Sequence, residues 1–137
     1  MRRLRHALQL LMQLLIVGLL VGLACWPLNS IDQLQDRLLA LLPGFSGGPW
    51  TPLALVIAAS PLVVMPLLLM LQRGWLRSGS GSGIPQTILS LEHPERADGL
   101  LGAAPTLARL LLWVIASLAV FPLGREGPVV QVGAAVA

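Results

Sequence analysis

The sequence has little charge, few aromatic residues and almost none of the residues that build disulfides or metal centres. Of its 137 residues, 11% are charged and 4% aromatic, with one cysteine and no tyrosine. A soluble domain carries about 25% charge, so an ordinary globular fold is excluded. Hydrophobic residues make up 55%, which excludes a disordered chain. A lone Cys25 allows no intrachain disulfide and no cysteine-built metal site.

Lysine is absent as well, and this absence limits the possible partners. All nine basic residues are arginines, and they form no run beyond Arg2, Arg3 and Arg5. Because nucleic-acid binding requires a basic stripe or patch, we expect no nucleic-acid partner. His93 stands among charged residues that predict a solvated loop, so we expect no metal ligand there. The residues suggest no cofactor, no catalytic residue and no enzymatic reaction.

Long apolar runs are what the sequence does contain, and they identify a membrane chain with a mean hydropathy of +0.80. The first run, about 7–28, contains an uncharged stretch from Ala7 to Trp26 that would span roughly 30 Å as a helix, the thickness of a bilayer core. It is longer than the apolar part of a signal peptide and no A-x-A site follows, so we expect a membrane anchor. Further runs lie at about 52–72, 107–123 and 126–137.

The expected fold is all-α, a polytopic membrane protein with broken and re-entrant helices. The run at 107–123 contains about 22 Å of uncharged helix, which is too short to cross a bilayer upright. The next run begins almost at once, as in helices that meet at membrane depth. Between the first two runs, Ser30 and Gln33 have the spacing of a capping box, which predicts a separate amphipathic helix at the membrane interface.

The distribution of arginine predicts how the chain is oriented. Three arginines precede the first run and three follow the second, whereas the loop between these runs has only Arg37. The positive-inside rule therefore predicts a cytoplasmic N-terminus and a cytoplasmic 72–106 segment. We expect a multi-pass protein of the plasma membrane or a bacterial inner membrane, with lipid as its surroundings.

Two short polar segments carry the chemistry. In Arg125-Glu126-Gly127-Pro128, a carboxylate between apolar runs is costly at membrane depth, so it is a functional candidate, although a water-exposed loop would hold it harmlessly. In Gly81-Ser82-Gly83-Ile84-Pro85, a glycine turn leads into a short helix at about 84–92, although such repeats are also typical of flexible linkers. Proline in the first helical turn and free N–H groups there favour an anion at both helix starts.

The two segments, with Val-Val-Gln-Val-Gly after the second, resemble the first two signature motifs of the CLC chloride channels and transporters. The resemblance implies that residues 1–137 are the N-terminal part of a transmembrane domain of this family, an incomplete first inverted repeat of the CLC fold. It implies chloride transport, as a channel or as a proton–chloride exchanger, and a homodimer. The family's later chloride contacts, a G-x-F-x-P stretch and a tyrosine, are missing, so we expect a fragment that does not conduct alone.

The resemblance also implies roles for individual residues. Glu126 would be the gate, with a deprotonated side chain that blocks an anion position, and the Ser82 hydroxyl would bind chloride. The backbone around Gly83 and Ile84, and from Arg125 to Gly127, would line the anion path. We expect the Arg125 side chain to anchor the loop or shape the electric field. The alternative is a small membrane protein that transports nothing and serves as an assembly partner or scaffold.

Overall fold

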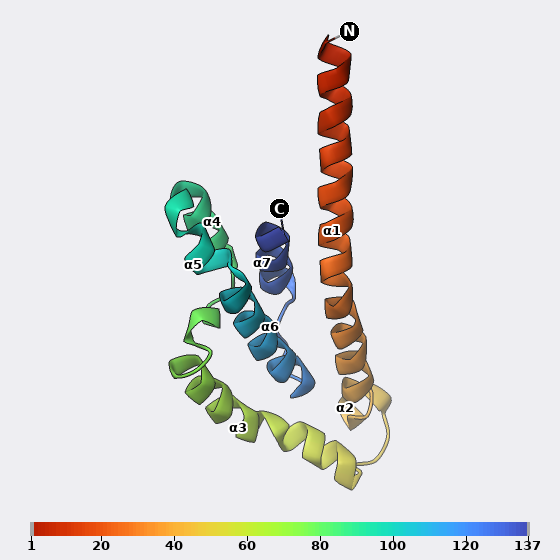
Figure 1. Ribbon diagram of the computed structural model, residues 1–137. Coiled ribbons are helices and arrows are strands. Elements are labelled where there is room, and N and C mark those ends of the chain that lie inside the picture. The colour runs from red at the N-terminus through yellow and green to blue at the C-terminus, as the bar shows by residue number, and fades with distance from the viewer. Residues whose placement is uncertain (1, 137) are drawn as a thin grey trace.

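The structure, a computed structural model, describes residues 2–136 and contains helices without any strand in that range. This confirms the expected all-α class (Figure 1). The elements are α1 (Arg2–Leu39), α2 (Pro43–Ser46), α3 (Pro52–Arg73), the 3-10 turn η1 (Arg77–Gly79), α4 (Ile84–Glu92), the 3-10 turn η2 (Pro94–Arg96), α5 (Ala97–Leu101), α6 (Ala103–Leu118) and α7 (Glu126–Val136).

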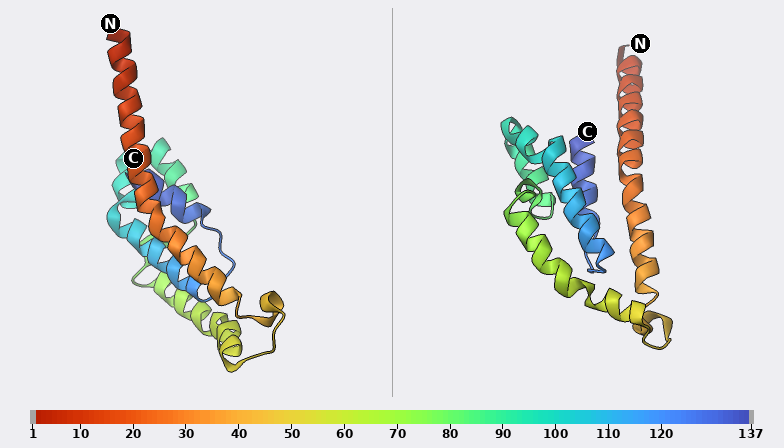
Figure 2. Two further views of the ribbon diagram at one scale, coloured as in Figure 1. Left: turned by 90° about the vertical axis from the view of Figure 1, so that its right-hand side faces the viewer. Right: turned by 60° about the horizontal axis from the view of Figure 1, so that its bottom comes forward.

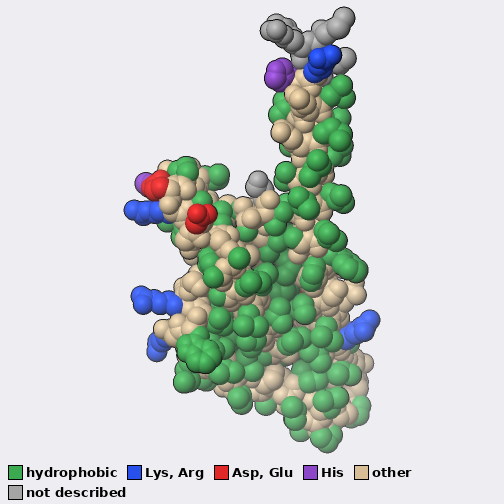
Figure 3. Space-filling model, in the orientation of Figure 1, with side chains coloured by type: hydrophobic (Ala, Val, Ile, Leu, Met, Phe, Trp, Pro, Cys, Tyr) green, Lys and Arg blue, Asp and Glu red, His purple; other side chains and the backbone are tan. Residues whose placement is uncertain are grey.

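Two helices in the described part of the chain, α1 and α3, are long and apolar enough to cross a membrane. Counting η2 and α5 together with α6 as one span, bent by 43° at its break, brings the number of such spans in the described residues to three. The charged side chains lie near the margins of the face shown in Figure 3, and apolar side chains cover much of the surface between them. These features agree with a helical membrane protein.

The first helix, α1, is one continuous element of 38 residues, about 57 Å long. The prediction of a separate amphipathic helix capped by Ser30 is wrong, because α1 continues through both Pro27 and Ser30. A proline removes one backbone hydrogen bond, a loss that membrane helices tolerate. This end of α1 packs against the remaining chain, and Gln35 Nε2 donates to the carbonyl of Phe121 at 2.7 Å.

Helix α3 begins where the sequence provides a cap and curves where it contains prolines. The Thr51 hydroxyl accepts a hydrogen bond from the amide of Ala54 at 3.1 Å, and Pro52 occupies the first turn. Pro61 has no N–H for the carbonyl of Ile57, and the Ser60 hydroxyl donates to that carbonyl at 2.8 Å instead. The helix therefore continues past its proline with the carbonyl satisfied.

Helix α6 spans Ala103–Leu118, so it begins and ends earlier than the run expected at 107–123. At its end the amide of Phe121 donates to Ala116 O and that of Val120 to Ser117 O, the pattern of a Schellman motif. Val120 has a φ of 53°, a left-handed conformation that is strained for a β-branched residue. Pro122 follows, and the chain runs on without helix to Glu126.

Helix α6 lies at the centre of the packed part of the molecule. It contacts α1, α3 and α7, and α7 lies between α6 and α1 in Figure 1 and in the right-hand view of Figure 2. The core forms where α3 meets α6, around Leu68, Leu112 and Ala116. The N-terminal half of α1 extends away from this core, and the most apolar window of α1 buries none of its residues in the molecule.

Candidate functional site

The two polar segments singled out in the sequence meet at the starts of α4 and α7. Gly127 is buried against the backbone of Ser82, and a Cβ added at Gly127 would overlap the carbonyl oxygen of Ser82. Gly83 has a φ of +98°, and a Cβ there would lie 2.8 Å from the carbonyl oxygen of Gly127. Glycine is required at both positions because the two backbones approach too closely for a side chain.

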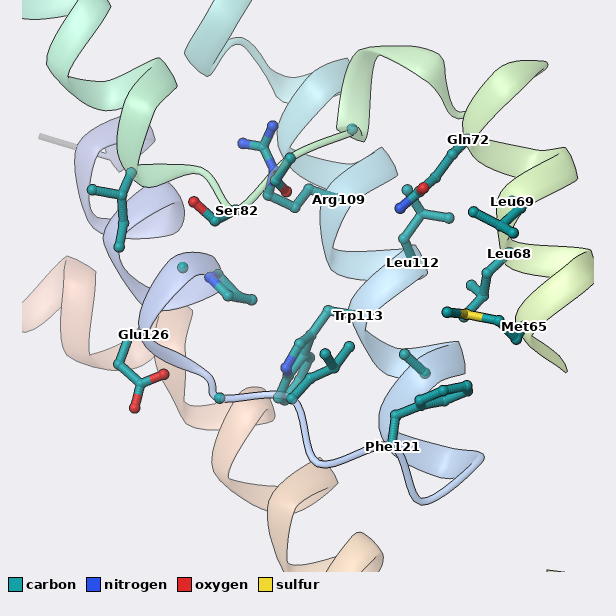
Figure 4. A pocket seen from close by; sticks show the side chains of 18 residues that line it. Met65, Leu68, Leu69, Gln72, Ser82, Arg109, Leu112, Trp113, Phe121 and Glu126 are labelled. Atoms are coloured by element: carbon teal, nitrogen blue, oxygen red, sulfur yellow. The ribbon is translucent and has the colours of Figure 1, made fainter. Parts of the chain in front are cut away.

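A cavity of about 510 Å³ opens beside this contact (Figure 4). Its walls are mostly apolar, with four polar or charged side chains, from Gln72, Ser82, Arg109 and Glu126. A mostly apolar wall with few polar groups is typical of a small-ligand site. The remaining lining residues are Met65, Leu68, Leu69, Gly79, Gly81, Ile84, Leu112, Trp113, Ala116, Phe121, Leu123, Gly124, Gly127 and Pro128.

Both helix starts at the cavity leave backbone N–H groups without intrahelical acceptors. In α7 the first helical hydrogen bond runs from the amide of Val129 to Arg125 O at 3.0 Å, so the amides of Glu126 and Gly127 precede the ladder. In α4 the corresponding bond runs from Thr87 to Gly83 O at 3.0 Å. The partial positive charge of a helix start favours an anion, and two such starts here border one cavity.

The loop that carries Ser82 is held by the side chain of Gln86. Its Oε1 accepts from the amide of Gly83 at 3.1 Å, and its Nε2 donates to Ser80 O at 3.3 Å. The Thr87 hydroxyl donates to Gly83 O at 3.0 Å. Because these bonds fix the backbone on both sides of Ser82, its hydroxyl is presented from a rigid turn.

Arg109 is a residue of the site that the sequence analysis missed. It lies on α6 with 3% of its surface exposed, and it donates from Nε to Gly81 O at 3.2 Å and from Nη2 to Ser80 O at 3.0 Å. Its Nη1 donates to Gln131 Oε1. No carboxylate among the described residues pairs with it. The cavity therefore has a buried guanidinium in its wall that forms no ion pair with a described carboxylate.

Gln131 connects this arginine to the rest of the fold. Its side chain is fully buried on α7, and its Nε2 donates to Leu100 O at 2.9 Å and to the Thr106 hydroxyl at 3.1 Å. The Thr106 hydroxyl in turn donates to Leu101 O at 3.1 Å. These bonds join α5, α6 and α7 behind the Ser82 loop, so the position of Arg109 is determined by three helices.

Glu126 is the first residue of α7, and its side chain is exposed. In Figure 4 the carboxylate points away from Ser82, although both residues line the cavity. The carboxylate folds back over Gly124, where an added Cβ would overlap it. Arg125 does not line the cavity; its Nη1 donates to Asp32 Oδ2 at 3.0 Å and to Asn29 Oδ1 at 3.3 Å, both on α1.

The structure thus brings most of the candidate residues to one place. Ser82, Ile84, Glu126 and Gly127 line the cavity, and Gly83 lies directly behind it against Gly127. In the part of the chain that the structure describes, no group of three or more histidine, cysteine or acidic residues could hold a metal ion. The donors at the cavity are the free amides of the two helix starts and the Arg109 guanidinium, and donors of this kind suit an anion.

These features define a helical membrane protein with a site that favours an anion. The model of the voltage gated chloride channel family matches residues 62–137, more than half of the chain, and the chain belongs to this family. The matched region contains every residue that lines the cavity. Neither a curated protein nor a solved structure matches the chain. Family membership confirms the resemblance noted in the sequence and supports chloride transport across a membrane as the general function.

Proposed function

We propose that this chain forms part of a chloride path in which Glu126 is a protonatable gate. In this proposal the Ser82 hydroxyl and the free amides at the starts of α4 and α7 bind the anion. Ile84 and Gly127 line the path, and Gly83 supports it. Arg125 anchors the gate segment, the stretch of residues 121–126 that ends at Glu126. The transport mode is that of a channel or of a proton–chloride exchanger.

The observation that carries the proposal is the backbone contact between Gly127 and Ser82. This contact puts the hydroxyl of Ser82 and the carboxylate of Glu126 on the wall of one cavity, together with two helix starts. A side chain that is negative when deprotonated competes with a permeating anion for the same positive region. Protonation of Glu126 removes this competition, so flux should depend on pH and on chloride together.

The positive charges that face an anion in this cavity are partial charges, which suits a path that must bind the ion and then release it. Helix starts offer partial charges, which attract an anion and still release it. Arg109 is a full charge, but its guanidinium donates to Ser80, Gly81 and Gln131, behind the loop that presents Ser82. We infer that it strengthens the positive field and leaves the binding of the ion to weaker donors.

The test is chloride flux from liposomes that contain the whole protein in which this sequence occurs. Glu126→Ala should keep chloride flux and remove its dependence on pH, and Glu126→Gln should resemble the protonated, open state. Glu92→Ala is the matched control, because this carboxylate is also exposed but lies at the far end of α4. Unchanged pH dependence in Glu126→Ala would refute the gate.

Two further measurements sharpen the proposal. Ser82→Ala removes one anion ligand and should lower the affinity for chloride without removing the pH dependence. A pH gradient applied to the liposomes separates the modes, because only an exchanger moves chloride against its gradient when protons flow. Absence of flux in every variant and in the unaltered protein would support the alternative of a membrane protein that does not transport.

We also propose that residues 1–137 belong to the transmembrane domain of a multi-pass protein that dimerises in the plasma membrane or a bacterial inner membrane, with its N-terminus in the cytoplasm. The arginine distribution supports this orientation. Single cysteines introduced at Arg37 and Arg77 in a Cys25→Ser background test it, since both arginines are exposed. In intact cells an impermeant maleimide should label position 37 and not position 77. Labelling of position 77 alone would reverse the orientation.

A further inference from the structure

Trp113 is a buried side chain in the cavity wall, and its polar atom has no partner. It has 5% of its surface exposed, and its ring lies between Phe121 and Glu126 in the cavity (Figure 4). The indole Nε1–H is shielded from solvent and has no acceptor among the described residues. A buried tryptophan normally pairs this N–H, because an unpaired donor raises the free energy of the folded state. The donor therefore lacks an acceptor in this conformation.

The cavity contains few groups that Trp113 can donate to. Arg109, on the same helix, offers only donors, and α3 contributes no titratable side chain to the cavity wall. Arg125 and Asp32 pair with each other between the gate segment and α1. Glu126 is the one anionic side chain in the lining, and its carboxylate accepts no hydrogen bond from another described residue.

We propose that the indole N–H of Trp113 donates to the anion that occupies this side of the cavity. The acceptor is the Glu126 carboxylate when it turns inward, or the halide that takes its place; both are anions that accept one hydrogen bond. This inference rests on the proposed function, because it takes Glu126 as the gate. Since Nε1 is covered while Glu126 points outward, the bond belongs to the state in which the gate segment has moved.

The direction of the effect follows from the charge of the acceptor. A donor to a carboxylate stabilises its deprotonated form and keeps the gate closed down to a lower pH. Without the donor, Glu126 takes up a proton more readily and the path opens at a higher pH. A hydrogen bond to a charged group is strong enough to move the midpoint by about one pH unit.

The test compares Trp113→Phe, which keeps an aromatic ring and removes the N–H, with Trp75→Phe. Trp75 is 95% exposed and lies outside the cavity, so it controls for the loss of an indole. Both changes are made in the unaltered protein and in Glu126→Ala. Chloride flux from liposomes is measured against pH and against chloride concentration, with gluconate as the replacing anion.

Each outcome has a defined meaning. A rise of the pH midpoint in Trp113→Phe that disappears in the Glu126→Ala background supports the carboxylate as acceptor. A several-fold loss of apparent chloride affinity that persists in that background supports the permeating halide. If Trp113→Phe matches Trp75→Phe in both backgrounds, the inference is overturned. Failure of Glu126→Ala alone to alter the pH dependence would instead refute the proposed gate.

A spectroscopic measurement avoids dependence on the fold of Trp113→Phe. The other three tryptophans of this sequence, Trp26, Trp50 and Trp75, are 68%, 60% and 95% exposed, so we expect their replacement by phenylalanine to leave the fold intact. The ¹⁵N-labelled indole of Trp113 then reports its hydrogen bond directly. Its N–H resonance should move downfield as pH rises or as chloride replaces gluconate. A resonance that moves in neither titration would overturn the inference.

Discussion

The segment that carries Ser82 and the segment that carries Glu126 lie against each other, yet their surroundings hold them differently. The Ser82 loop receives hydrogen bonds from Arg109 and Gln86, and Arg109 is itself fixed through Gln131. The segment before Glu126, residues 121–125, has no helical structure. Its long-range side-chain links all go to α1: Arg125 pairs with Asp32 and donates to Asn29, and the carbonyl of Phe121 accepts from Gln35.

This difference matches the two tasks that the proposed function assigns. An anion ligand works best when it is held rigidly, because ordering it then costs no free energy as the ion arrives. A gate has to change position, and the hydrogen bonds that hold Arg125, directly before Glu126, are exposed. The firmly held Ser82 loop and the more loosely held segment before Glu126 therefore lie next to each other, joined at the backbone contact between Gly127 and Ser82.

The largest expected effect comes from the rigid side. Arg109→Met leaves the carbonyl of Gly81 and the side-chain oxygen of Gln131 without this donor, and leaves the carbonyl of Ser80 with Gln86 alone. We expect the free energy of unfolding to fall by about 2–4 kcal/mol, since each buried acceptor left unpaired is costly. Arg109→Lys keeps the charge, but a lysine lacks the planar fork that reaches three acceptors, so it should rescue only in part.

The measurement for Arg109 is thermal unfolding of the detergent-solubilised protein, followed by chloride flux of the variants that remain folded. Arg96→Met is the matched control, because Arg96 is exposed and forms no ion pair in the described chain. If Arg109→Met unfolds at the same temperature as Arg96→Met, the Ser82 loop is not held by this network and the comparison fails.

A change at the contact between the two segments should have the next largest effect. In Gly127→Ala the new Cβ overlaps the carbonyl of Ser82, and a backbone atom cannot swing aside as a side chain can. We expect a loss of about 1–3 kcal/mol, as in other overpacked sites, and a strong loss of chloride flux. Gly99→Ala is the control, because a Cβ there meets nothing within 4 Å. Equal flux in both variants would contradict the close approach.

The smallest effect is expected on the mobile side. Asp32→Ala removes the ion-pair partner of Arg125, whose side chain is 53% exposed. An exposed pair contributes about 0.2–1 kcal/mol, and salt screens it, so the variant and the parent should converge in stability at high ionic strength. Asp36→Ala, further along the same helix, is the control. A loss as large as that of Arg109→Met would show that the gate segment is held as firmly as the Ser82 loop.

The sequence predicted the local features of the site well. The glycines and prolines that begin α4 and α7 act at short range, so a turn followed by a helix start could be placed at Gly83 and at Glu126. The all-α class followed from the apolar runs. The expected helix at 84–92 matches α4 because its start is set by the local pair Gly83 and Pro85.

The features that the sequence did not predict depend on contacts between distant residues. Arg109 stands at the edge of an apolar run, where an arginine is read as a membrane boundary, and its acceptors Gly81 and Gln131 lie 28 and 22 residues away. A charge at the head of a run too short to span the membrane was the one available signal. Ser30 was misread because a cap signal is local, whereas the continuation of α1 depends on packing against Phe121.

The closeness of Gly127 to Ser82 also determines how the site fails. A substitution at one position also affects the other, because an added methyl group at residue 127 displaces the loop that carries residue 82. A backbone shift in either segment therefore moves both the anion ligand Ser82 and the gate Glu126. In a saturation mutagenesis experiment, Gly83 and Gly127 should stand out as positions that accept no substitution, while their exposed neighbour Ile84 accepts several.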